Sequence, residues 1–170
     1  DDVALRLGHL ETAIRTAEGP LTDTGRAFGY AMRGVRVAAG EAEIAKWIDT
    51  AFRLAEAKQS WTELTDLYRS VVDDILDGDV QQDVRLRIGE LARTKLSDRA
   101  LAVEHYKKAL EAKSDDRRAM IALEELYAEA GDSQNLLDIL KMRVEAAQDD
   151  AEKKALYYRI ADLQKGPLAD

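Results

Sequence analysis

The chain has 170 residues, of which 46% are hydrophobic and 34% charged, and it contains no cysteine. This composition predicts one folded domain or a short repeat array, and it excludes a disordered chain, a disulfide scaffold and a cysteine-bound zinc site. With 33 acidic and 25 basic residues the formal charge is −8, whereas nucleic-acid-binding modules usually carry a basic surplus, so we expect no nucleic-acid partner.

The sequence offers no candidate membrane segment. Its longest run without a charged residue covers only residues 27–32, far short of the roughly 20 apolar residues that a spanning helix needs. No basic-then-apolar signal peptide opens the chain. We therefore expect no membrane insertion and a cytoplasmic protein; a secreted fragment whose signal peptide has been removed is the alternative.

Apolar residues recur with helical spacing through almost the whole chain, which has only two prolines, Pro20 and Pro167. No alternating run of β-branched or aromatic residues predicts a strand. We expect nine amphipathic helices joined by short polar connections, at about 3–17, 23–39, 42–58, 61–76, 80–96, 99–113, 116–130, 134–147 and 151–165. Short connections make neighbouring helices antiparallel hairpins.

Individual residues mark several helix ends and contacts. Ser60 and Glu63 have the spacing of a capping box, and Gly131 suits a left-handed residue at a helix C-terminus. Gly25 and Gly29 form a GxxxG pattern that arginines interrupt, which favours a close helix crossing in a soluble protein over a membrane dimer.

The chain contains an internal repeat. When it is shifted by 72 residues, residues 64–91 align with residues 136–163 without a gap, and seven of the 28 positions are identical. A 72-residue unit with four helices corresponds to two hairpins of about 36 residues. Six of the ten glycines precede residue 41. We therefore divide the chain into an irregular glycine-rich helical pair or cap, residues 1–40, and a repeat array, residues 41–170.

Small and large residues alternate at the contact positions of two successive predicted helices. The positions are Ile88, Gly89 and Ala92 in the first helix and Ala102, Tyr106 and Ala109 in the second. In this pattern each hairpin resembles a tetratricopeptide repeat (TPR). The resemblance implies an all-α, right-handed α-solenoid of antiparallel hairpins, in which the first helices line a concave groove that takes a peptide or a partner helix.

The resemblance also assigns candidate partner-binding residues to the groove-facing positions of the first helices. They are Lys46, Asp49, Arg53, Asp83, Glu90, Arg93, Arg118, Glu125, Tyr158 and Asp162. Asparagine is absent from these positions, so we do not expect capture of a C-terminal carboxylate. Arginines there can hold a partner's carboxylates with two hydrogen bonds. The alternative is that the groove charges pair only with each other.

We find no pattern typical of a catalytic or metal site. The two histidines, His9 and His105, belong to different repeat units, and neither a P-loop nor a GxGxxG motif occurs. The acidic stretch at residues 73–83 fails the ligand spacing of an EF-hand. We expect no catalytic residues, no metal and no cofactor.

Three functional hypotheses follow. The first is a non-catalytic scaffold that binds a protein or peptide. The second is a regulatory or docking segment of a larger multidomain protein such as an enzyme, because the chain begins without methionine and both ends fall inside a repeat unit. The third is a helical enzyme with a site of acids and arginines. Self-association through an exposed array end is a further expectation.

Overall fold

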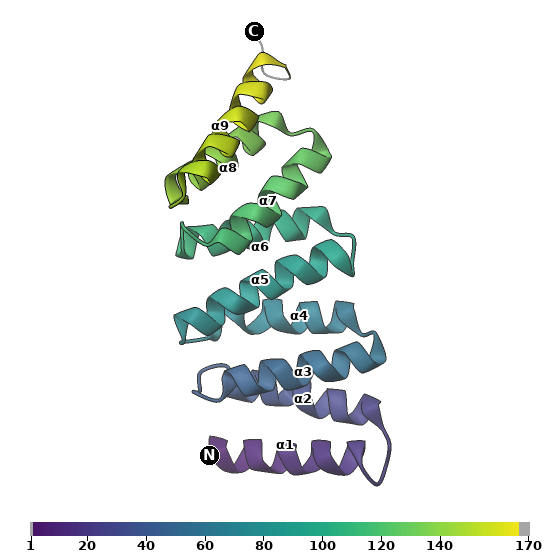
Figure 1. Cartoon of the computed structure of the whole chain (residues 1–170). Coiled ribbons are helices and arrows are strands. Elements are labelled where there is room, and N and C mark those ends of the chain that lie inside the picture. The colour runs from purple at the N-terminus through teal and green to yellow at the C-terminus, as the bar shows by residue number, and fades with distance from the viewer. Residues whose placement is uncertain (1, 167–170) are drawn as a thin grey trace. The chain divides into compact units, whose positions relative to one another are not determined.

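In the computed structural model, residues 2–166 are described, and the secondary structure in this range is helical (Figure 1). The helices are α1 (Val3–Glu18), α2 (Thr24–Ala38), α3 (Ile44–Lys58), α4 (Trp61–Val71), α5 (Gly78–Thr94), α6 (Arg99–Ala112), α7 (Arg117–Ala130), α8 (Ser133–Ala146) and α9 (Asp150–Lys165). A 3₁₀ turn, Val72–Asp74, follows α4. For the described residues, the prediction of an all-α chain with nine helices is confirmed.

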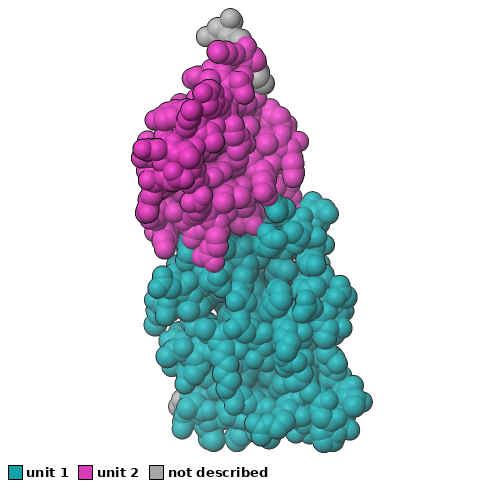
Figure 2. Space-filling view, in the orientation of Figure 1, with its two compact units in different colours: residues 1–97 teal, residues 98–170 magenta. Residues whose placement is uncertain are grey.

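The chain forms two compact units, residues 1–97 and residues 98–170, which Figure 2 shows in teal and magenta. The first unit holds α1 to α5 and the second holds α6 to α9. Within each unit every helix packs against the next one in the chain and reverses its direction (Figure 1). This is the contact pattern of a helical repeat fold. The sequence-based division at residue 40 stays a prediction.

Aspartates begin most of the helices. In seven of the nine described helices the N-cap is an Asp whose carboxylate accepts a backbone N–H, which contributes about 1 kcal/mol per cap. These caps are Asp2, Asp23, Asp77, Asp98, Asp116, Asp132 and Asp149. The predicted capping box is wrong, because the side chain of Ser60 makes no cap hydrogen bond. The left-handed cap at Gly131 is confirmed, with φ of 66°.

Helix α4 ends earlier than the sequence predicts, at Val71 instead of residue 76. The chain tightens into the 3₁₀ turn and then buries Val72 and Ile75, while Leu76 is 83% exposed. Gln81 of α5 donates its side-chain amide to the carbonyl of Val72 at 2.9 Å, which satisfies a backbone acceptor that the end of the helix leaves free.

Helices α2 and α3 pack tightly against each other at Gly34. A Cβ atom added to Gly34 of α2 would lie 1.9 Å from Cε3 of Trp47, whose side chain is buried. A Cβ on Gly29 would meet nothing within 4 Å. The crossing predicted from the glycine-rich segment therefore depends on Gly34 and not on the GxxxG pair.

The small residues predicted at the helix contact of the repeat are buried. Ala102 and Ala109 of α6, the small contact residues of the predicted repeat, are both 0% exposed. Among residues 2–166, none of the helices is apolar over a length that could cross a lipid bilayer.

Candidate functional site

In the first unit, basic residues of α3 pair with acidic residues of α1. Lys46 pairs with Glu11, and Arg53 binds Glu18 through two hydrogen bonds of 2.6 and 2.9 Å. Both pairs join residues 35 positions apart, which is the length of one hairpin. The hydrogen bond from Arg53 holds the pKa of Glu18 below its usual value, and the same bond raises the pKa of Arg53.

A hollow of about 320 Å³ lies between these two ion pairs. Its lining includes the buried side chains of Ile14 from α1 and Trp47 from α3, and Thr50 also faces it. The hollow thus has apolar residues at its base and charged side chains at its rim. Such a site can accept an apolar side chain of another polypeptide whose neighbours are charged.

Arg87 of α5 connects α5 to α3. Its guanidinium lies 2.8 Å from Asp49 of α3 and 2.7 Å from Asp83 of its own helix, and it stands over the ring of Phe52. Burial alone would lower the pKa of Arg87, but the hydrogen bonds to the two carboxylates raise it overall. A second hollow of about 220 Å³ lies beside this group, with Ile48 in its lining.

In the second unit, α7 and α9 pair in the same way. Arg117 binds Glu152 at 2.7 Å, and Arg159 binds Glu124, again across 35 positions in each pair. Arg143 of α8 joins the two pairs, because it contacts Glu124 and lies 3.0 Å from Glu152. Burial alone would lower the pKa of Arg143, but these carboxylates raise it overall.

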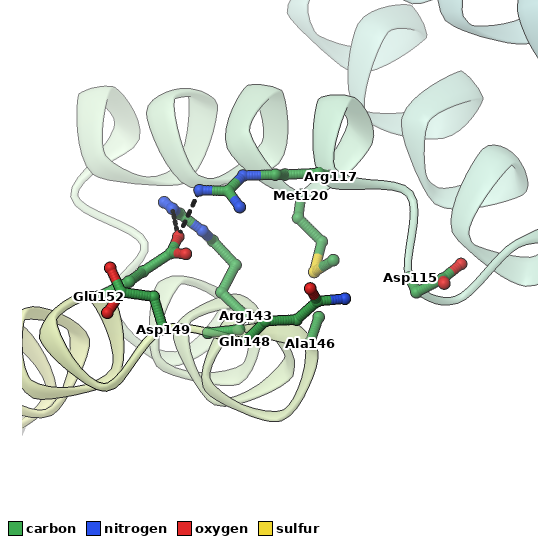
Figure 3. A pocket seen from close by; sticks show the side chains of 9 residues that line it. Asp115, Arg117, Met120, Arg143, Ala146, Gln148, Asp149 and Glu152 are labelled. Atoms are coloured by element: carbon green, nitrogen blue, oxygen red, sulfur yellow. Dashed lines mark hydrogen bonds and ion pairs between the residues drawn. The ribbon is translucent and has the colours of Figure 1, made fainter.

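A hollow of about 330 Å³ lies next to this network, as Figure 3 shows. Arg117 and Met120 project from α7, while Arg143 rises from α8 toward Glu152 at the start of α9 (Figure 3). Met120 is 1% exposed and forms part of the lining, as Ile14 does in the first unit.

The two units use equivalent positions. Adding 106 to the numbers of the four charged residues on α1 and α3 gives the four charged residues on α7 and α9. The signs differ. In the first unit both acids lie on α1, whereas in the second unit each helix carries one acid and one base. The repeat therefore preserves the place of the cross-hairpin pairs but not their polarity.

The structure places the sequence-predicted site residues in several different settings. Four of them belong to the ion pairs of the first unit: Lys46, Asp49, Arg53 and Asp83. Arg93 lies 3.8 Å from Glu90 on the same helix, and Arg118 lies 3.4 Å from the N-cap Asp116. Three more have exposed side chains: Glu125, Tyr158 and Asp162.

Sequence reasoning selected one member of each cross-hairpin pair in the first unit and neither member of the pairs in the second unit. The residues it did not select are Glu11, Glu18, Arg87, Arg117, Glu124, Arg143, Glu152 and Arg159. A usable signal exists, because four pairs of opposite charge are spaced by one hairpin length of 35 residues. On α7 the paired residues precede the predicted ones by one position, which is a rotation of about 100° around the helix axis.

Comparison with known proteins adds no assignment. No family model matches the chain, and no curated protein is similar to it at a significant level. Within residues 2–166, no group of three or more His, Asp or Glu side chains is placed to hold a metal ion. Any functional proposal therefore depends on the chain's own surfaces.

Proposed function

We propose that the chain is a non-catalytic protein-interaction scaffold of the TPR-like type, which binds a peptide or a partner helix at the hollows between its first helices. The main support for the proposal is that the same arrangement of hollow and ion pairs occurs in both units. Between α1 and α3, and again between α7 and α9, a hollow with a buried apolar residue in its lining adjoins ion pairs at equivalent positions of the repeat.

The basic side chains at the rim of the first hollow can exchange an acidic side chain of α1 for a carboxylate of a bound peptide. The side chains of Lys46 and Arg53 are 62% and 57% exposed. Exposed ion pairs of this kind stabilise a fold by only about 0–1 kcal/mol, so a partner's carboxylate can replace Glu11 at little cost, whereas one that replaces Glu18 must match its two hydrogen bonds to Arg53. Arg53 already shows the two-bond geometry that binds a carboxylate firmly.

The electrostatics of the site also favour binding over catalysis. The pKa of Glu18 is lowered, and those of Arg53, Arg87 and Arg143 are raised. Each of these shifts stabilises the charged form of the side chain. A general acid or base requires the opposite, a group whose pKa is brought near the working pH.

A peptide-display selection tests the proposal. A random peptide library is panned against the folded chain, and the affinities of the selected peptides are measured by isothermal titration calorimetry. T50W fills the hollow between α1 and α3, because Thr50 lines it. T62W is the matched control, since Thr62 is an exposed threonine on α4 away from that hollow.

We expect T50W to weaken the selected peptides by about ten-fold or more and T62W to leave their affinity unchanged. Peptides that bind T50W as tightly as the unmodified chain would show that this hollow is not the binding site. A panning that yields no specific peptide would contradict the scaffold proposal itself.

A further inference from the structure

One face of α9 is apolar and exposed. Tyr157 and Tyr158 are 58% and 63% exposed, and together with Ala161 they line a shallow hollow of about 500 Å³. Lys154 stands over the ring of Tyr158 at 6.0 Å. Only Leu156 of this helix is fully buried, on the side where α9 packs against α8.

The internal repeat indicates that this face normally belongs to a helix contact. The 72-residue shift aligns Tyr158 with Leu86 and Ala161 with Gly89 of α5. Leu86 is 6% exposed and Gly89 is buried. The repeat position of Tyr158 is thus covered in α5 and exposed in α9, whereas Ala161 is half-buried and Tyr157 aligns with the partly exposed Arg85. An amphipathic helix with a second apolar face needs a further helix to cover it.

We propose that a second copy of this chain covers the tyrosine face of α9, through an antiparallel pairing of the two α9 helices around a two-fold axis. This surface is separate from the hollows of the proposed function. In the pairing, Tyr157 and Tyr158 of one copy meet the same residues of the second copy at the axis. Lys154 lies opposite the small Ala161, which leaves room for the lysine stem.

Charge complementarity favours the second copy as the occupant. Asp150 begins the helix and Lys165 ends it, and both lie on the stripe that runs through Lys154, Tyr158 and Ala161 at helical spacing. An antiparallel pair with its axis between the tyrosines brings Asp150 of each copy to the level of Lys165 of the other. The contact is self-complementary, as a two-fold interface requires. A parallel pair would oppose like charges.

The area of the tyrosine face of α9 determines how tightly two copies are expected to bind. Four tyrosines exposed by somewhat more than half contribute roughly 500 Å² of surface, about a third of a standard protein interface. We therefore expect a weak dimer with a dissociation constant on the order of 100 µM.

Sedimentation velocity from about 10 µM to about 1 mM tests the proposal. The expected result is a reversible rise in mass from 18.9 kDa toward twice that value. Y157S/Y158S should weaken the dimer by about ten-fold or more. The control L76S removes an exposed apolar residue of the first unit and should change nothing. Circular dichroism verifies that each variant is folded.

Charge variants test the arrangement. D150K and K165D should each lose self-association, because each opposes like charges twice, and an equimolar mixture of the two should recover it as a heterodimer. A monomer up to about 1 mM would overturn the proposal. So would a dimer that Y157S/Y158S does not weaken, or a mixture of D150K and K165D that stays monomeric.

Discussion

Replacing Gly34 by alanine adds one methyl group at the crossing of α2 and α3. The new carbon would lie 1.9, 2.1 and 2.6 Å from three carbons of the Trp47 ring, whereas carbon atoms in contact are normally about 3.5–4.0 Å apart. Trp47 is 2% exposed, so its ring can retreat only toward the hollow between α1 and α3 that it lines. We therefore expect G34A to destabilise the first unit.

The magnitude follows from two opposing effects. Overpacking a core costs about 1–3 kcal/mol, and this overlap is severe enough to reach the upper end. Alanine is favoured over glycine inside a helix by about 0.5–1 kcal/mol. The net effect of G34A is a loss of about 2 kcal/mol, or a fall in Tm of about 4–8 °C. The control G29A, in the same helix, should gain about 0.5–1 kcal/mol, because its added methyl meets no atom within 4 Å.

Thermal and urea unfolding followed by circular dichroism measure both variants. A double-mutant cycle with W47L isolates the contact, since the penalty of G34A should largely disappear once the indole ring is removed. A G34A variant that unfolds at or above the temperature of the unmodified chain would refute the packing described for α2 and α3. An equal loss of stability from G34A in the chain that already carries W47L would refute it as well.

Three other substitutions have defined expected outcomes. A109L should overpack the fully buried site of Ala109 and cost about 1–3 kcal/mol in thermal melts; an unchanged melting curve would contradict the helix contact. E18Q should cost up to about 1 kcal/mol near pH 7. The folded state lowers the pKa of Glu18 from 4.5. The stabilisation is therefore present above pH 4.5 and is lost as the pH falls through the lowered pKa. The free energies of unfolding of E18Q and the unmodified chain, measured against pH, should thus converge in acid. E124Q removes the buried charge between two arginines and should cost about 3 kcal/mol in urea unfolding, whereas E129Q at an exposed site of the same helix should cost less than about 0.5 kcal/mol. A loss at Glu124 no larger than that at Glu129 would show that the network does not stabilise the second unit.

The helices could be predicted from the sequence because two strong signals agree. Apolar spacing fixes which face of each segment is buried, and an Asp stands at most of the points where a helix begins. The end of α4 could not be predicted in this way. Val71, Val72, Ile75 and Leu76 continue the helical spacing, but the chain leaves the helix in a turn that accepts a hydrogen bond from the side chain of Gln81 on the next helix.

The candidate site was predicted only in outline. Helical spacing identifies residues that share a face of a first helix, such as Lys46, Asp49 and Arg53. It does not reveal which residue of another hairpin each one meets, because that depends on the rotation and register of two packed helices. Arg143 illustrates the limit, since it belongs to a second helix and reaches the pairs of α7 and α9 from the side. Opposite charges one hairpin apart are the signal that would have added the missing partners.

The most direct test of the account uses the two tryptophans of the chain. Trp47 lines the hollow between α1 and α3, whereas Trp61 donates its indole N–H to Gln59 at 3.2 Å and does not line that hollow. Two-dimensional NMR resolves the two indole N–H signals, which W47F and W61F assign, while a selected peptide is added. If the peptide binds in this hollow, the Trp47 signal shifts in a saturable way and the Trp61 signal does not move. A bound peptide that leaves the Trp47 signal in place would contradict the account.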